Sequence, residues 1–213
     1  AGLYATILNV KGFEETCKAI KQCWCSLFNL RVINYCLNRK ITLEKMKLAV
    51  IVQKMVHAEK SGVIFTVNPL KGYDREMIIE ACFGLGEALV GGEVTPDQYF
   101  YDWSRLTESN RIIQTKKIAL YAISEPPFIE KIELPDSVKN QEVLTVTEVK
   151  ELSAIALSIQ AGYGFPVDIE WVKFNEKFYI VQSRPITMIN YNGIEGEWTT
   201  ADFKDGGVTS SVG

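Results

Sequence analysis

The sequence predicts an α+β protein in which helices pack against a sheet of mostly antiparallel strands. Three observations lead to this prediction. Apolar residues recur at helical spacing in two segments, β-branched runs separated by polar turns lie between them, and a strand–turn–strand pattern follows the second helical segment. Because helices and hairpins are mixed along the chain, the fold class is α+β or mixed α/β.

The first helical segment covers residues 13–39. Its apolar positions are three or four residues apart, as on one face of a helix: Phe13, Cys17, Ile20, Trp24, Leu27 and Phe28. A break near residues 26–29 predicts two successive helices instead of one.

Five runs rich in β-branched or aromatic residues are predicted strands, at residues 47–56, 62–67, 77–81, 98–103 and 111–118. A glycine-rich stretch, Gly84-Leu85-Gly86, follows the third run. It lacks the third glycine of a dinucleotide-binding loop, because position 89 is Leu. Such glycines either present backbone N–H groups to an anion or permit a tight turn, and both interpretations stay open.

The clearest helix begins at Thr145, because Thr145 and Glu148 have the spacing of a capping box. An apolar stripe follows over residues 149–159, and a glycine at 162 or 164 can end the helix in a left-handed turn. Two further strands are predicted at residues 167–174 and 177–181. The pattern at Asn175-Glu176 between them is that of a hairpin.

Four polar side chains lie on this predicted hairpin. Side chains alternate between the faces of a strand, so Asp168 and Glu170 share one face, and Gln182 and Arg184 share a face of the neighbouring strand. A carboxylate, an amide and a guanidinium that converge suit a nucleotide polyphosphate. The oxygens are hard ligands for Mg²⁺, and Arg offers a planar fork to phosphate. The alternative is a cross-strand Glu–Arg pair on a solvated sheet face.

A short segment ends the first predicted strand: Gln53, Lys54, Met55 and Val56. An adenine ring can lie between apolar walls there, with Val52, Met55 and Ile180 as candidates and backbone groups contacting its edge. The alternative is that these apolar residues belong to the core. His57, the single histidine, follows in a polar turn and is expected at the surface.

The composition excludes several classes of function. Lys and Arg number 23 against 26 Asp and Glu, so no excess of positive charge is available for nucleic acid. One histidine rules out Cys2His2 zinc sites. The five cysteines, without a Cys-x-x-Cys pair, are expected to be reduced thiols of a cytoplasmic protein. No apolar run approaches the ~20 residues that cross a bilayer, so no membrane partner is expected.

Taken in order, these segments resemble the nucleotide-binding domain of the phosphoenolpyruvate synthase (pyruvate, water dikinase) family, which pyruvate phosphate dikinase and rifampicin phosphotransferase share. The matching segments are residues 52–56, Ser61 to Thr66, Gly84 to Glu87 with Pro96-Asp97, Asp168 to Trp171 and Val181 to Pro185. The resemblance covers residues 1 to about 189. Residues 190–213 are expected to be a linker or the truncated start of another domain.

The resemblance implies an ATP-grasp fold, incomplete at its N-terminal side, that binds ATP and Mg²⁺. Family members transfer a phosphoryl group from ATP to a histidine on a separate swivelling domain. From there it passes to pyruvate, with phosphoenolpyruvate, AMP and phosphate as products, or to rifampicin. By resemblance, Glu170 and Gln182 hold Mg²⁺ and the phosphates, and Arg184 neutralises charge on the transferring group. Glu170 and Arg184 are thus implied catalytic residues, and residues 53–56 an adenine-binding hinge.

The N-terminal residues resemble the family's loop near the phosphates. Gly2 and Thr6 match this loop, but Leu3 replaces a Gln and Ala5 an acidic residue. The family's preceding lobe, phosphohistidine domain and pyruvate-binding domain have no counterpart in this sequence. They are expected in the same polypeptide, and the isolated chain is expected to be inactive. A non-catalytic ATP-binding or scaffold module is the alternative, motivated by Leu3 and Ala5.

Overall fold

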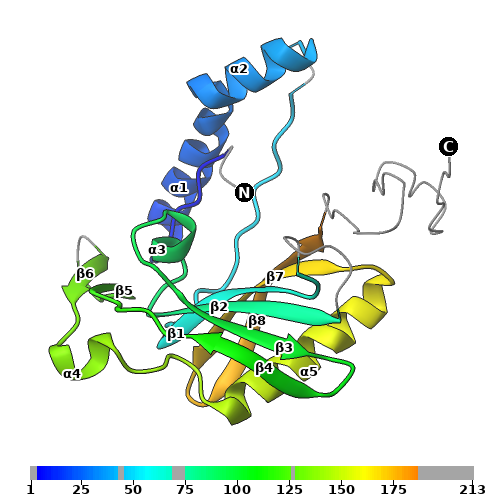
Figure 1. Ribbon diagram of the computed structural model, residues 1–213. Coiled ribbons are helices and arrows are strands. Elements are labelled where there is room, and N and C mark those ends of the chain that lie inside the picture. Colours follow the sequence, from blue (N-terminus) through cyan, green and yellow to red (C-terminus); the bar gives the residue numbers. More distant parts are fainter. Residues whose placement is uncertain (1–3, 43–45, 69–74, 126–127, 187–213) are drawn as a thin grey trace, which may run out of the picture. The chain divides into compact units, whose positions relative to one another are not determined.

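The computed structural model describes residues 4–42, 46–68, 75–125 and 128–186 (Figure 1). The chain divides into two compact units. One comprises Ala1–Met55 with Ala122–Ile129, and the other Val56–Tyr121 with Glu130–Gly213. The predicted linker or domain start at residues 190–213 lies outside the described residues. Among the helices that the structure describes, none is both long and apolar enough to span a bilayer.

The first unit contains the two predicted helices. They are α1 (Phe13–Cys25) and α2 (Leu30–Arg39), separated by the 3₁₀ turn η1 (Ser26–Phe28). The predicted break near residues 26–29 is therefore confirmed. Asn29 caps α2, because its side-chain oxygen accepts a hydrogen bond of 2.8 Å from the backbone N–H of Val32.

The prediction of a strand at residues 47–56 is wrong. Residues 46–58 carry no helix or strand assignment, and the side chains of Ile51 and Val52 are 85% and 67% exposed. A β-branched run forms a strand only when a neighbouring strand pairs with it. In the described part of the chain, no strand pairs with this segment.

The second unit is built on a six-stranded sheet with the order β4-β3-β2-β1-β7-β8. Its strands are β1 (Lys60–Phe65), β2 (Glu76–Phe83), β3 (Asp97–Asp102), β4 (Thr107–Ile112), β7 (Val167–Phe174) and β8 (Lys177–Pro185). Every neighbouring pair is antiparallel. With the helices, the sheet confirms the predicted α+β class. Five of the predicted strands are found, one of them (residues 167–174) with the predicted ends and four with shifted ends.

The strand predicted at residues 111–118 is interrupted. Its first residues end β4, and its last residue begins β5 (Ile118–Ala122), which pairs with β6 (Ile129–Glu133) in a separate two-stranded sheet. Between them, the backbone N–H of Gln114 donates to the carboxylate of Asp97, and that of Lys116 donates to the carbonyl of Lys139. One N–H group is thus bonded to a side chain, and the other to a residue outside the six-stranded sheet, so neither continues the backbone ladder of β4.

Helix α5 (Val146–Tyr163) covers one face of the large sheet (Figure 1). The predicted capping box is present, and Gly164 ends the helix with a left-handed φ of 78°. Val149, Leu152 and Ala156 of the helix pack against Ile64, Ile79, Ile169 and Trp171 of the sheet. The short helices α3 (Glu87–Val90) and α4 (Asp136–Lys139) lie outside this core.

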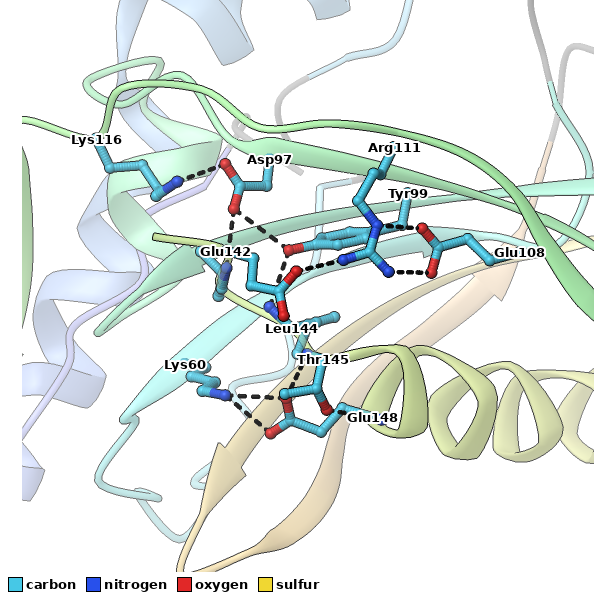
Figure 2. Close-up of polar contacts among 11 residues, drawn as sticks. Lys60, Asp97, Tyr99, Glu108, Arg111, Lys116, Glu142, Leu144, Thr145 and Glu148 are labelled. Carbon is cyan, nitrogen blue, oxygen red and sulfur yellow. Dashed lines mark hydrogen bonds and ion pairs between the residues drawn. The ribbon is translucent and has the colours of Figure 1, made fainter. Parts of the chain in front are cut away.

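Buried polar groups hold the ends of these elements in place (Figure 2). The Asp97 carboxylate accepts hydrogen bonds from Lys116, Tyr99 and two backbone N–H groups, those of Gln114 and Val143. The Glu148 carboxylate of the capping box also accepts hydrogen bonds from Lys60 of β1 and from Lys173 of β7. These contacts fix the segment before α5, and the start of α5 itself, against the sheet.

Candidate functional site

The hairpin β7–β8 carries the polar side chains predicted to form a site. Asn175 and Glu176 both adopt positive φ angles, 46° and 59°, which is typical of a two-residue hairpin turn. Glu170 lies opposite Gln182, and Asp168 lies opposite Arg184. The register shifts by one residue between Glu170 and Trp171, so Val181 is the extra residue of a β-bulge. The structure thus brings all four side chains to one face, opposite the face covered by α5.

Arg184 pairs with Asp168. The guanidinium donates from Nε at 2.7 Å and from Nη2 at 2.5 Å, both to Oδ2 of Asp168. The Asp168 side chain is buried, whereas the Arg184 side chain is 45% exposed. The expected alternative, a cross-strand Glu–Arg pair, is therefore found in a different form, because Asp168 and not Glu170 is the carboxylate that pairs with Arg184. The guanidinium is therefore held at one edge and remains open to solvent elsewhere.

Glu170 is a half-buried carboxylate in an unfavourable environment. Burial raises its pKa above the ordinary value, and the nearby Asp168 carboxylate raises it further, while Arg184 opposes both effects. Its carboxylate forms no hydrogen bond or ion pair with another described side chain. By contrast, Glu80, two strands away on the same face, accepts a hydrogen bond of 2.9 Å from Gln98.

These carboxylates fit a divalent cation. The second oxygen of Asp168, Oδ1, is buried without a hydrogen-bond partner among the described residues. A cation favours the ionised form of carboxylates that burial and mutual repulsion disfavour. Glu170 and Gln182 offer oxygen ligands of the kind that Mg²⁺ prefers. Within the described ranges no three His, Cys, Asp or Glu residues gather around one point, so these residues would supply only part of a coordination shell.

The other predicted binding residues lie outside this hairpin. Residues 53–56 belong to the segment without regular structure, where Gln53 and Lys54 are exposed and Met55 and Val56 are half-buried. Thr6 is exposed, and Gly2 lies outside the described residues. His57 is exposed, as expected, with its ring centroid 6.2 Å from that of Phe174.

The glycine-rich stretch forms a turn. Gly84 has a φ of 75°, and a Cβ atom there would lie 2.1 Å from the carbonyl oxygen of Leu120. The backbone N–H groups of Gly84 and Leu85 donate to the carbonyls of Glu59 and Leu120. Since both donors are already bonded within the protein, the structure favours the tight-turn interpretation over an anion-binding loop.

Sequence reasoning missed the role of Asp168. The alternation of side chains placed it beside Glu170, but its partner on the next strand depends on the register of the hairpin. Knowledge of the turn and of the bulge is needed to predict that register. The same is true of the buried pair Asp97–Lys116, whose members are 19 residues apart and lie in segments with different predicted structure.

Comparison with known proteins decides the family. A family model described as "Pyruvate phosphate dikinase, AMP/ATP-binding domain" matches residues 1–199. The chain belongs to the pyruvate phosphate dikinase AMP/ATP-binding domain family. The predicted resemblance is thereby confirmed.

Three relatives are much longer than this chain, which matches only part of each. A probable phosphoenolpyruvate synthase of Archaeoglobus fulgidus is 42% identical over 206 residues, 97% of this chain and 27% of the relative. One of Methanocaldococcus jannaschii is 41% identical over 189 residues, 89% of this chain and 16% of the relative. A rifampicin phosphotransferase of Bacillus cereus is 40% identical over 189 residues, 89% of this chain and 21% of the relative. The chain therefore spans less than a third of the length of each of these relatives.

Proposed function

We propose that this chain is the larger, C-terminal part of an ATP-grasp domain that binds Mg-ATP and supplies its phosphoryl group to a histidine on a separate swivelling domain. The observation that carries the proposal is the convergence of Glu170, Gln182 and the Asp168–Arg184 pair on the sheet face opposite α5. The membership of residues 1–199 in an AMP/ATP-binding family supports it.

Each residue of the hairpin has a distinct proposed role. Glu170 and Gln182 would hold Mg²⁺, which would supply positive charge to neutralise the phosphates. Mg²⁺ is commonly held by one or two carboxylates together with substrate phosphates and water, which agrees with the small number of ligands here. Arg184 stabilises negative charge on the transferring group, and Asp168 orients its guanidinium. Phosphoryl transfer depends mainly on such positioning and charge neutralisation.

The segment 53–56 is proposed to contact the adenine ring, and the N-terminal loop with Gly2 and Thr6 to lie near the phosphates. The remaining parts of the enzyme are proposed to be a preceding lobe, a phosphohistidine domain and a pyruvate-binding domain. Exposed apolar side chains of the first unit are evidence for a further lobe that would cover them. Their exposed fractions are 83% for Phe13, 67% for Phe28, 77% for Leu30 and 69% for Leu37.

The proposed overall reaction converts ATP, pyruvate and water to phosphoenolpyruvate, AMP and phosphate in the cytoplasm. The two probable phosphoenolpyruvate synthases support pyruvate as the acceptor. Rifampicin is the second candidate, because a rifampicin phosphotransferase is similar to the chain at 40% identity. A non-catalytic ATP-binding or scaffold module is the third, motivated by Leu3 and Ala5.

Calorimetry with Mg-ATP on the full-length polypeptide that contains this chain tests the proposal. Glu170→Gln and Arg184→Ala are compared with Glu151→Gln and Arg105→Ala, which alter exposed side chains elsewhere in the second unit. We expect weaker ATP binding or slower turnover in the first pair alone. Unchanged affinity and turnover in both site variants would exclude the assignment.

The acceptor is identified with the same preparations. AMP release that requires pyruvate supports a phosphoenolpyruvate synthase, and release that requires rifampicin supports the antibiotic-modifying alternative. ATP binding without phosphorylation of any histidine would support the scaffold module instead.

A further inference from the structure

Asn9 connects the N-terminal segment to a distant turn of the first unit. Its side chain is 5% exposed, and Nδ2 donates to the carbonyl oxygens of Ile123 at 2.9 Å and Phe128 at 2.5 Å. Both hydrogens of the amide are thereby used. These carbonyls belong to the connection between β5 and β6, where the N–H of Ile123 also donates to Phe128.

A second attachment lies on the other side of Thr6. The backbone N–H of Ala5 donates to Oγ of Ser26 at 3.0 Å, and the thiol of Cys23 donates to the carbonyl of Ala5 at 3.5 Å. Ser26 Oγ in turn donates to the carbonyl of Cys23 at 2.6 Å. Residue 5 is therefore attached to the end of α1 through both of its backbone polar groups.

Thr6 thus lies between two fixed points in a segment that has no helix or strand of its own. Such a segment takes its conformation from its attachments, because no backbone ladder restricts its φ and ψ angles. Thr6 itself is exposed, so the residue is accessible to a ligand while the neighbouring residues hold the segment in position.

We propose that Asn9 is a positioning residue for nucleotide phosphates. Its two hydrogen bonds hold the segment with Thr6 in the conformation that receives the polyphosphate of ATP, and they do not contribute to binding of the nucleoside. This inference rests on the proposed function. The segment is then already ordered in the folded protein, so ligand binding does not have to order it. A preorganised segment therefore binds more tightly than one that the ligand must order.

The competing explanation is that position 9 requires Asn because of its backbone conformation, and not because of its side-chain hydrogen bonds. Its φ is 55°, and Asn tolerates this left-handed conformation better than most residues. Two substitutions separate the explanations. Asn9→Gly keeps access to the left-handed conformation but removes the amide donors, and Asn9→Asp keeps the size of the side chain but places a carboxylate against two carbonyl oxygens.

The experiment measures the affinities of Mg-ATP and of adenosine for the full-length polypeptide and its variants. In Asn9→Gly and Asn9→Asp we expect the dissociation constant of Mg-ATP to rise about tenfold, the size of a lost hydrogen-bond contribution. The dissociation constant of adenosine should stay unchanged. Ser26→Ala removes one of the two hydrogen bonds that attach Ala5, and it does not alter a left-handed residue. It should raise the ratio of the Mg-ATP to the adenosine dissociation constant as well.

Asn29→Ala is the matched control, because it removes an asparagine side chain of the same unit that caps α2. We expect it to lower the melting temperature and leave the ratio of the two dissociation constants unchanged. Unchanged ATP affinity in Asn9→Gly, or a parallel loss of ATP and adenosine affinity, overturns the role of Asn9 while the proposed function stands. A wild-type protein that binds no ATP overturns both.

Discussion

Asp168 holds the Arg184 guanidinium through Nε and Nη2, with both hydrogen bonds on a single carboxylate oxygen. Asp168→Asn removes the charge that orients Arg184. If Arg184 stabilises the transferring group, kcat falls about 10- to 100-fold, since hydrogen bonds to charged groups contribute about 1.5–3 kcal/mol. Steady-state kinetics of the full-length protein measure this. Asp136→Asn, at an exposed carboxylate of α4, is the control, and an equal kcat in both variants contradicts the orienting role.

Glu170→Gln is expected to stabilise the nucleotide-free protein at pH 7 while weakening Mg-ATP binding. Because the folded state raises the pKa of Glu170, ionising this group at neutral pH costs folding free energy. That cost diminishes as the pH falls and the carboxyl is protonated, so the difference between variant and wild type should shrink towards acidic pH. Urea unfolding at pH 7 and pH 4 checks the sign. A variant less stable than wild type at pH 7 argues against a strained carboxylate.

The buried pair of Lys116 and Asp97 should be sensitive to single substitutions. The two side chains are 1% and 0% exposed and 2.5 Å apart. Breaking such a pair costs about 3–5 kcal/mol, because the remaining charge stays buried. Asp97→Asn should cost more than Lys116→Met, since Asp97 also accepts bonds from Gln114, Val143 and Tyr99, and an amide NH₂ group would face one of these donors. Unfolding followed by tryptophan fluorescence measures both, and equal stabilities would contradict the ranking.

Acid should weaken the attachment of α5 to the sheet. Burial alone would raise the pKa of Glu148, but hydrogen bonds from Lys173, Lys60 and the Thr145 backbone outweigh it and lower the pKa to about 2. The folded pKa lies below the unfolded value of about 4.3. The contribution of Glu148 is therefore complete above that value and lost as the pH falls towards 2. Glu148→Gln should flatten the loss of stability between pH 5 and pH 2.5. An unchanged slope would show that other carboxylates dominate.

Gly62 on β1 should not tolerate a methyl group. An added Cβ would lie 1.8 Å from the carbonyl oxygen of Glu80 and 2.8 Å from the ring of Trp171. Gly62→Ala is expected to destabilise the protein by about 3 kcal/mol or to prevent folding. Gly162→Ala in α5 is the control, because no atom lies within 4 Å of its added Cβ. It should be neutral or stabilising by up to about 1 kcal/mol. Similar melting temperatures for the two variants would contradict the packing.

Local signals allowed much of the second unit to be predicted. The helix after Thr145 was predictable because capping, apolar spacing and a terminal glycine agree over 18 residues. The hairpin after residue 167 was predictable because its turn and both strands are contiguous. In each case the deciding interactions lie within a few residues along the chain.

Long-range pairing explains what could not be predicted. Residues 48–52 have the composition of a strand but are not paired with one, and composition does not report on partners. The segment 113–117 leaves the sheet because backbone N–H groups there bind Asp97 and Lys139. For the candidate site, residue types and faces indicated Glu170, Gln182 and Arg184, whereas the pairing of Arg184 with Asp168 and the attachment of Asn9 required the folded chain.

The bulge at Val181 decides which side of the sheet the guanidinium occupies. Residues 177–180 of β8 pair in order with residues 174–171 of β7. Val181 is the extra residue, and the pairing resumes with Gln182 opposite Glu170. Without that one-residue shift, Gln182 would lie opposite Ile169 and turn towards α5. The extra residue at Val181 therefore keeps Gln182 and Arg184 out of the apolar core. The spacing of this hairpin is as essential to the site as the identity of its side chains.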